Sequence, residues 1–191
     1  MTVGSQAEAG AKPLRYGELD RSVIVAAALR IAQAGGIAKV TVRSLAAELG
    51  LSTTAMYHYV DGKAELLNLI AEATLASVEL PATGSWQERL RVFARSAREA
   101  LLRIDGIAEV LQTHPAKGAA QQVDTLMHQL VVDAGVAEPR REAARILLMI
   151  FVLGSVSLEQ ALDGLAHQLT ETPDARFEQG IDVLIAGLEA L

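Results

Sequence analysis

The chain has 191 residues, 51% of them hydrophobic, which is enough to bury a sizeable core in one large domain or two small ones. It contains no cysteine, so a disulfide framework, a thiolate metal site and a cysteine nucleophile are excluded. Aromatic residues make up only 4%, while alanine, leucine and valine abound, and this mixture favours closely packed helices over a β-sandwich. We therefore expect an all-α fold.

The formal net charge of −6 argues at first against nucleic acid as a partner, because phosphate neutralisation needs lysine and arginine. The distribution of charge is uneven, however. Residues 1–65 carry seven Lys/Arg and six Asp/Glu, whereas residues 66–191 carry ten against seventeen. Any contact with DNA is therefore expected in the first third of the chain.

The N-terminal sequence lacks the basic patch and apolar run of a secretion signal. The longest uncharged apolar stretch, Ile146 to Leu158, is shorter than the roughly 20 residues that span a bilayer. We expect a soluble, cytoplasmic protein without a membrane partner.

Residues 1–17 are rich in Ala, Gly and Ser and show no apolar periodicity, so they are expected to form a flexible arm. Lys12 and Arg15 in this arm are candidates for contact with DNA, and a disordered terminus without that role is the alternative. The first predicted helix begins near Asp20 and stops at Gly35 and Gly36.

Two short helices are predicted next, joined by the turn Gly50-Leu51-Ser52. Thr41 is the expected N-cap of the first, which turns Val42, Leu45, Ala46 and Leu49 inward, and Ser52 or Thr53 is the cap of the second, which reaches Tyr59. Asp61 is expected to cap a longer helix from Lys63 to about Glu79. This spacing predicts a helix-turn-helix DNA-binding domain over residues 18–66.

The second short helix is predicted to present a polar face. At 100° per residue, Thr53, Thr54, Tyr57 and His58 fall within an arc of about 140°, opposite most of the apolar residues. Each can hydrogen-bond a base edge or a phosphate, and none is acidic. Lys63 lies in the first turn of the next helix, where a cation opposes the helix dipole. A DNA phosphate would favour it there, and a solvated surface lysine is the alternative.

The segment TVRSLAAELGLSTTAMYHYVDGKAELL, from Thr41 to Leu67, resembles the signature of the TetR family of repressors, and the preceding AAALRIAQAGG fits the first helix of that family. The resemblance implies that Arg43 contacts a base or a phosphate, and that Thr53, Thr54 and His58 face base edges. Tyr57 and Lys63 would bind phosphates, Thr41 would be both cap and phosphate contact, and Tyr59 takes a position where the family often binds phosphate.

The remaining residues, 67–191, are expected to form a helical ligand-binding and dimerisation domain. Helices are predicted over roughly 86–103, 106–112, 119–134, 139–165 and 174–190, with prolines at their boundaries. Segments in this region are similar to the tetracycline-repressor branch of the family. Val110 stands where the tetracycline binders have a magnesium-holding His, so magnesium-tetracycline is not the expected ligand.

The last predicted helix carries an apolar stripe of Phe177, Ile181, Leu184, Leu188 and Leu191, with Gly180 and Gly187 at its edge. The long helix before it is apolar nearly all round from Ile146 to Val156, so burial on most sides is expected. The family resemblance implies that two such helices per subunit form a four-helix dimer interface. Completion of each monomer's own core is the alternative.

Candidates for an effector pocket are apolar or singly polar residues of the body, namely Leu111, Thr113, His114, Met127, His128, Met149 and Phe151. The four histidines, His58, His114, His128 and His167, lack metal-ligand spacing, and no catalytic grouping is evident. We expect no metal, no cofactor and no enzyme.

The sequence thus predicts a homodimeric, ligand-responsive repressor that binds palindromic operator DNA and is released by a small-molecule effector. The alternative is a ligand-sequestering or partner-binding helical protein without operator binding.

Overall fold

The computed structural model describes residues 20–113, 118–162 and 170–191, and all regular structure in these ranges is helical, as predicted. The elements are α1 (Arg21–Gly35), η1 (Ile37–Lys39), α2 (Val42–Glu48), α3 (Thr53–Met56), α4 (Lys63–Ala76), α5 (Trp86–Leu102), α6 (Ile107–Thr113), α7 (Ala119–Asp133), α8 (Glu138–Leu162) and α9 (Pro173–Glu189). The arm predicted over 1–17, with Lys12 and Arg15, lies outside the described residues, as do His114 and His167.

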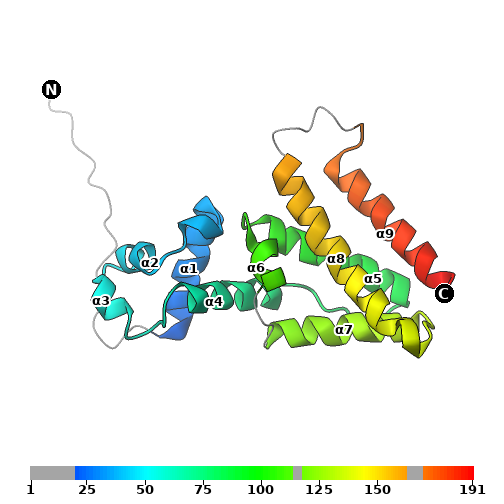
Figure 1. The fold of residues 1–191 in the computed structure, drawn as a ribbon, viewed down its shortest axis with the longest axis horizontal. Coiled ribbons are helices and arrows are strands. Elements are labelled where there is room, and N and C mark those ends of the chain that lie inside the picture. The colour runs from blue at the N-terminus through cyan, green and yellow to red at the C-terminus, as the bar shows by residue number, and fades with distance from the viewer. Residues whose placement is uncertain (1–19, 114–117, 163–169) are drawn as a thin grey trace, which may run out of the picture.

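The helices form two groups that α4 connects. Figure 1 shows α1, α2 and α3 at one end of the molecule, α5 to α9 at the other, and α4 running from the first group into the second. Contacts agree with this view, because α4 packs against α1 on one side and against α5, α6 and α7 on the other. Helix α4 therefore belongs to both the N-terminal group and the body.

The short helices α2 and α3 begin at the caps expected from the sequence. The Thr41 Oγ1 atom accepts a hydrogen bond from the Ser44 N–H at 2.9 Å, and the Ser44 side chain accepts one from the Thr41 N–H, also at 2.9 Å. The Ser52 hydroxyl accepts the Ala55 N–H at 3.1 Å. These bonds satisfy amides that a helix start leaves unpaired, and so define where each helix begins.

The turn between α2 and α3 depends on Gly50. Its φ of 67° lies in the left-handed region that favours glycine, and the turn closes when the Leu51 N–H donates to the Ala46 carbonyl at 2.9 Å. Behind the turn, Leu45 and Met56 are fully buried. The two short helices are thus fixed against each other and against α1.

The start of α4 differs from the prediction that Asp61 caps it. The N-cap is Gly62, which has no side chain to accept a hydrogen bond, and the Asp61 N–H instead donates to Glu65 Oε2 at 2.5 Å. The carboxylate that stabilises this helix end belongs to Glu65, a residue of the first turn whose side chain extends toward the N-terminus of the helix. The helix also ends at Ala76, earlier than the predicted Glu79.

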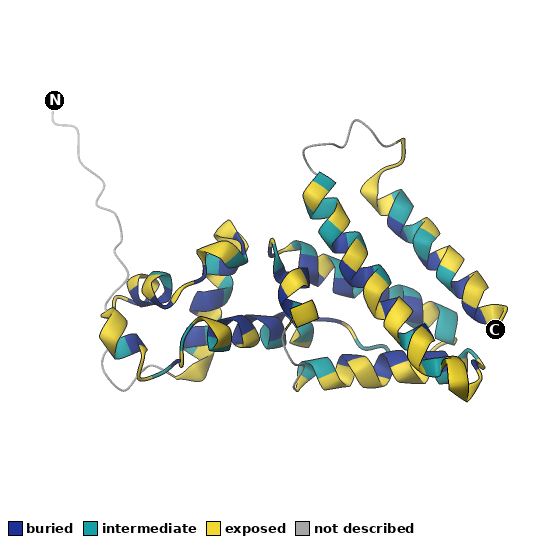
Figure 2. Cartoon of the chain, in the orientation of Figure 1, coloured by how far each residue is buried: buried dark blue, intermediate teal, exposed yellow. Residues whose placement is uncertain are grey.

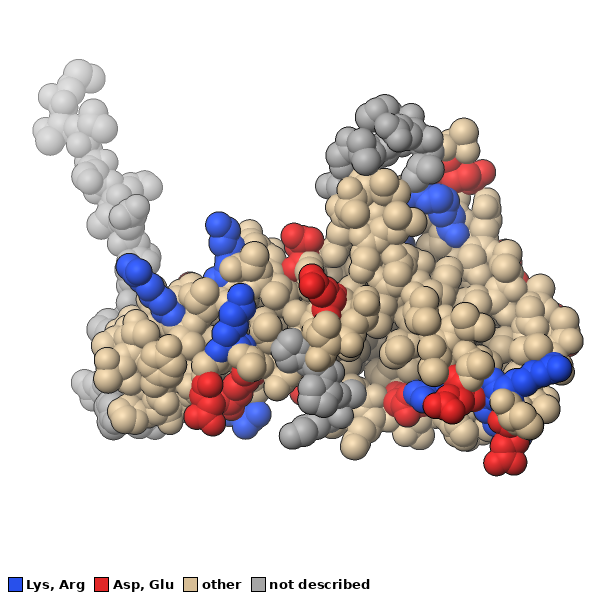
Figure 3. Space-filling model, in the orientation of Figure 1, with Lys and Arg blue, Asp and Glu red and all other residues tan. Residues whose placement is uncertain are grey.

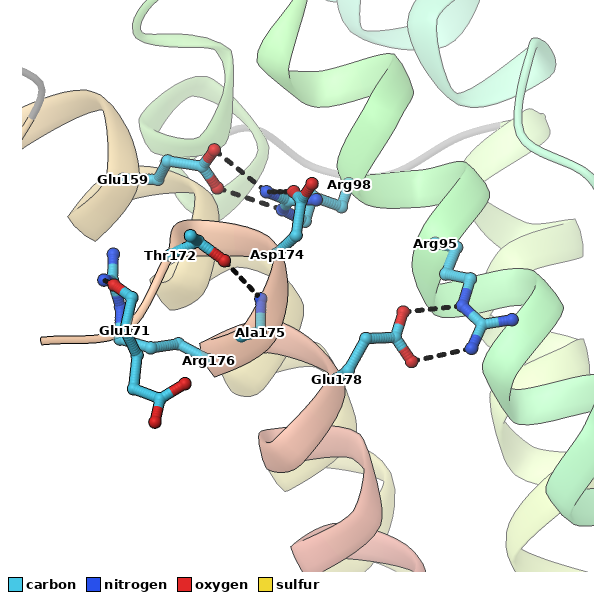
Figure 4. Close-up of polar contacts among 9 residues, drawn as sticks. All are labelled: Arg95, Arg98, Glu159, Glu171, Thr172, Asp174, Ala175, Arg176 and Glu178. Atoms are coloured by element: carbon cyan, nitrogen blue, oxygen red, sulfur yellow. Dashed lines mark hydrogen bonds and ion pairs between the residues drawn. The ribbon is translucent and has the colours of Figure 1, made fainter.

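A ladder of polar contacts holds α9 alongside α5. The α5 members are Gln87, Arg91, Arg95 and Arg98, and they contact Glu189, Asp182, Glu178 and Asp174 of α9, respectively. Figure 4 shows the Arg95 and Arg98 end of the ladder, where Arg98 also binds Glu159 of α8. Residue numbers of the paired side chains increase along α5 and decrease along α9, so the two helices are antiparallel.

Helix α8 is more exposed than its sequence suggested. Leu147 and Ile150 are 57% and 55% exposed, so the prediction of burial on most sides is wrong for the single chain. Exposed residues follow one side of α8 in Figure 2. The helix is long and apolar enough to cross a membrane by length and composition, with 22% of its most apolar window buried. It therefore presents an apolar face that the chain itself does not cover.

The apolar stripe of α9 turns inward. Phe177, Ile181 and Leu188 are buried, and Gly180 lies against the Phe151 ring of α8 in the same chain. The stripe expected at a dimer interface thus packs mainly within the monomer, and Val183, which is 71% exposed, lies on the opposite side of the helix. The open residue Gly187 is also on the exposed side, with no atom within 4 Å of an added Cβ.

Candidate nucleic-acid interface and internal cavity

Helix α3 ends at Met56, before the predicted end at Tyr59, and the helix and the turn after it present the polar side chains that the sequence predicted. Thr53, Thr54, Tyr57 and His58 are exposed, and Tyr57 is 57% exposed despite its aromatic ring. Met56, between them in sequence, is fully buried and anchors the helix to the core. Tyr59 is half-buried and packs against the core. The arrangement leaves two hydroxyls, a phenol and an imidazole on one outward surface.

Two cations lie on elements next to this surface. Arg43 is in the first turn of α2 and Lys63 is the first residue of α4, and both are exposed. Within the part of the chain that the structure describes, no ion pair holds either of them. On the face drawn in Figure 3, both basic and acidic side chains lie over the end that carries α1 to α3. These cations are therefore available to an anionic partner.

Thr41 differs from the other predicted contacts because its hydroxyl is already engaged. It takes part in the reciprocal bonds with Ser44, and the Ser44 hydroxyl also donates to the Lys39 carbonyl at 2.8 Å. The residue is exposed all the same. Its position is thus set by the helix start.

The N-terminal group is braced to the rest of the molecule. Arg30 of α1 and Glu48 of α2 form an ion pair at 2.9 Å, and η1 reaches the body, where the Ile37 N–H donates to the Asp105 carbonyl at 2.9 Å. Gln160 of α8 binds both sides of the turn that contains Asp105, since its amide contacts the Ile104 carbonyl and the Gly106 N–H. Helix α4 is therefore not the only connection between the two groups.

The body contains a cavity of about 1030 Å³ between α4, α5, α7 and α8. Its interior is apolar and includes Phe93, Ala97, Leu101, Val152 and Leu153, all of which are buried. Polar side chains among the lining residues come from α1, α4, α7 and α8, and they are Arg21, Glu65, Asn68, Glu72, Gln121, Asp124 and Arg145. An apolar volume with a few polar groups is what small-molecule sites in proteins provide.

Three of the predicted pocket residues line this cavity, namely Leu111, Met127 and Met149. Thr113 and exposed His128 are not in its lining, and His114 lies outside the described residues. Phe151 stacks on Phe177 instead, with ring centroids 5.2 Å apart. The α4 and α5 walls, with Glu72, Phe93 and Ala97, were absent from the sequence-based candidates, because periodicity along one helix does not reveal which helices enclose a space.

The described residues contain no group of three or more His, Asp or Glu side chains that could hold a metal ion. Val110 is buried.

Comparisons with known proteins agree with this geometry. Residues 24–70 match the pattern of bacterial regulatory proteins of the tetR family, and residues 80–172 match the tetracyclin repressor-like C-terminal domain. The chain is 32% identical to the tetracycline repressor protein class A from transposon 1721 of Escherichia coli, over 90% of this chain and 91% of that protein. It is also 32% identical to the transcriptional repressor DrrR1 of Streptomyces coeruleorubidus, over 91% of this chain but 64% of that longer protein.

Solved structures show the same fold. BioQ in complex with its natural double-stranded DNA operator has a TM-score of 0.77 and 28% identity, with 91% of this chain and all of that chain covered. The minocycline complex of the Q116A variant of TetR from Acinetobacter baumannii has a TM-score of 0.75 and 30% identity, over 91% of this chain and 98% of that one. The relatives are transcription regulators, and the chain belongs to the tetR family of bacterial regulatory proteins.

Proposed function

We propose that the chain is a transcriptional repressor that binds a palindromic operator as a homodimer and is released by a small molecule in the 1030 Å³ cavity. The observation that carries the proposal is the exposed surface of α3 and the turn after it, with hydroxyls, a phenol and an imidazole, and the exposed cations Arg43 and Lys63 on the adjoining helices. Such a surface offers donors to base edges and charge to phosphates. The DNA complex of BioQ supports this assignment.

The proposed DNA contacts are those expected from the sequence. The exposure of each side chain is used to assign it to phosphates or to bases. Arg43 and Lys63 neutralise phosphates or, for Arg43, contact a base, while the exposed side chains of α3 face the major groove. Thr41 and half-buried Tyr59 lie at the margin of this surface. The full proposed set is Thr41, Arg43, Thr53, Thr54, Tyr57, His58, Tyr59 and Lys63.

Dimerisation is proposed through the uncovered sides of α8 and α9. Leu147, Ile150 and Val183 are all more than half exposed in the single chain, and large apolar side chains left in water favour association. Covering these side chains with the same face of a second copy gives a two-fold dimer. Two α3 helices would then meet DNA half-sites about 34 Å apart, one turn of the duplex.

Effector release is proposed to work through α4. We assign residues 18–66 to DNA binding and 67–191 to ligand binding and dimerisation, although α4 (Lys63–Ala76) crosses this boundary as one helix. The cavity uses α4 as a wall, so an occupant that favours a different position of α4 also favours a different position of α3. The protein would work in the cytoplasm, where operator DNA lies, and by binding alone, without catalysis.

The test is a selection from random-sequence duplexes longer than two helical turns, captured by the full-length chain. We expect enrichment of an inverted repeat with half-site centres about one helical turn apart. Failure to enrich any sequence would overturn operator binding and favour a ligand-sequestering protein. Enrichment of a single, unrepeated site would overturn the dimer.

Variants then test the assigned surface on the enriched duplex. Arg43→Ala and Tyr57→Ala should each weaken binding by about 1–3 kcal/mol, while Arg103→Ala, an equal charge change at an exposed position of the body, should leave it unchanged. Equal effects of Arg43→Ala and Arg103→Ala would mean that only net charge matters, and would count against the assigned contact.

A further inference from the structure

One carboxylate of the cavity wall is held in place by the backbone of a neighbouring helix. Glu72 of α4 is half-buried, and its Oε2 atom accepts the Ala119 N–H at the start of α7 at 2.9 Å. Both carboxylate oxygens also lie within 3.3 Å of the position that a Cβ at Gly118 would occupy. The carboxylate thus fills the space that a side chain at residue 118 would need.

The charge of Glu72 has no cationic partner in the described part of the chain. Its one hydrogen bond there is to the Ala119 amide, and a carboxylate offers about four acceptor positions. The arginine of the cavity lining on α8, Arg145, is already paired with Asp124 of α7. Within the described residues, the Glu72 carboxylate therefore lies beside an apolar interior without an ion pair.

The same edge of α4 adds to the negative potential. Glu65 and Asn68 also line the cavity, at positions seven and four residues before Glu72, so the three share one helix face. Among the lining residues, the carboxylates of Glu65, Glu72 and Asp124 outnumber the cations of Arg21 and Arg145. Arg21 is exposed at the first turn of α1, where water screens its charge.

The remainder of the cavity sets the size and polarity of its occupant. Alanines at positions 71, 76 and 97 leave the volume open, and Phe93 and Leu101 make the interior apolar. A volume of about 1030 Å³ lies at the upper end of the range for small-molecule sites and so has room for a bulky molecule. An anionic compound would bring like charges together at the α4 edge, and a cationic one would pair with Glu72.

We infer that the effector is a bulky, mostly apolar molecule with a positively charged nitrogen, and that Glu72 is the residue that selects this charge. The inference rests on the proposed function only in calling the occupant an effector. The same carboxylate accepts a hydrogen bond from the first amide of α7. A cation that binds Glu72 therefore competes with this amide and weakens a contact between α4 and α7. Ligand selection and the position of α4 are in this way connected through one side chain.

The experiment uses two xanthene dyes of similar size and opposite charge, rhodamine 6G as the cation and fluorescein as the anion. Fluorescence polarisation with the full-length dimer measures each dissociation constant directly, without DNA. We expect rhodamine 6G to bind at least about tenfold more tightly than fluorescein, as one partly screened charge pair implies. Equal binding, the reverse preference or no binding of either dye would overturn the inference.

Variants test whether the Glu72 carboxylate is the source of the preference for the cationic dye. Glu72→Gln keeps an oxygen for the Ala119 N–H and removes the charge, so it should weaken rhodamine 6G binding about tenfold and narrow the difference between the dyes. Glu99→Gln, the same change at an exposed α5 position outside the cavity, is the matched control. Ala97→Leu should weaken both dyes by filling the interior, and Glu65→Gln gives a second charge variant that leaves the core intact. An unchanged dye preference in Glu72→Gln would overturn the role of Glu72.

The result is separable from operator binding. If the dye preference holds and no operator is enriched, the proposed function fails while the cation site stands. If an operator is enriched and the dyes show no charge preference, the cation site fails while operator binding stands.

Discussion

Arg95 of α5 and Glu178 of α9 form a bidentate pair, with Nε to Oε1 and Nη2 to Oε2 distances of 2.6 Å each (Figure 4). The hydrogen bonds from Arg95 hold the pKa of Glu178 below its usual value of 4.5, against the opposing effect of burial. The same pairing raises the pKa of Arg95. Two parallel bonds of this kind hold α9 at a defined height along α5.

The lowered pKa of Glu178 makes a small part of the stability pH-dependent. A carboxylate whose pKa falls on folding stabilises the native state above its unfolded pKa, and this contribution is lost as the pH drops through the folded value. The Glu178 side chain is 38% exposed, so after screening we expect less than about 1 kcal/mol. Urea unfolding should show Glu178→Gln less stable than wild type at pH 7, with the difference shrinking toward pH 3. A difference that does not change with pH would contradict the assignment, and Glu99→Gln serves as the control.

Gly118→Ala should destabilise the protein for two separable reasons. Residue 118 has a φ of 56°, and an added Cβ would lie 2.6 Å from Glu72 Oε2. Gly135→Ala is the matched control, because φ there is 79° but nothing lies within 4 Å. We expect about 1 kcal/mol of backbone strain in both variants and about 1 kcal/mol more in Gly118→Ala alone, because the Glu72 carboxylate must move aside and give up its bond to the Ala119 N–H. Chemical denaturation measures both, and Gly118→Ala combined with Glu72→Ala should recover the excess. Equal losses at the two glycines would rule out the contact with Glu72.

Leu147→Glu should convert the dimer into a folded monomer. The side chain is 57% exposed in the single chain, so a charge costs the monomer little, but in a dimer it would be buried against the partner. We expect at least about 2 kcal/mol of lost association energy, seen as a halved mass by light scattering with unchanged helical circular dichroism. Thr125→Glu, at an exposed position of α7, should stay dimeric. A Leu147→Glu protein of unchanged mass would place the interface elsewhere.

Thr41→Ala and Ser44→Ala distinguish the cap from the DNA contact. Each removes one half of the reciprocal bonds at the start of α2, so both should lower stability by about 1 kcal/mol. Only Thr41→Ala should weaken operator binding further, by about 1 kcal/mol beyond the effect of Ser44→Ala. Binding anisotropy on the enriched duplex measures this difference. Its absence would leave Thr41 with a capping role alone.

The N-terminal helices could be predicted well because their signals are local. Thr41, Gly50 and Ser52 act within four residues of their own position, and caps and left-handed turns follow from that chemistry. The exceptions were the cap at Asp61 and the ends of α3 and α4, which stop at Met56 and Ala76, before the predicted Tyr59 and Glu79. The Asp61 side chain could have capped α4. Instead, the Glu65 carboxylate in the first turn of α4 accepts a hydrogen bond from the Asp61 N–H. Residue type alone does not distinguish these two arrangements.

The body was predicted less well because its site depends on contacts between distant segments. Phe151 satisfied every sequence criterion for a pocket residue, yet it stacks on Phe177 of a helix more than twenty residues later. Glu72 and Ala97 satisfied none, since a surface glutamate and a core alanine carry no sequence signal for a cavity. The apolar sequence of α8 predicted burial on most sides, but Leu147 and Ile150 are exposed, because the pattern along one helix does not reveal which faces the same chain covers.

The close approach of Glu72 to Gly118 should also leave a record in the evolution of the protein. A side chain at residue 118 would displace the Glu72 carboxylate and cost its hydrogen bond to the Ala119 N–H, so a glutamate at residue 72 favours glycine at residue 118. Close homologues should therefore keep or exchange the two residues together. Paralogues that have lost the pair should be those that respond to compounds without a positive charge.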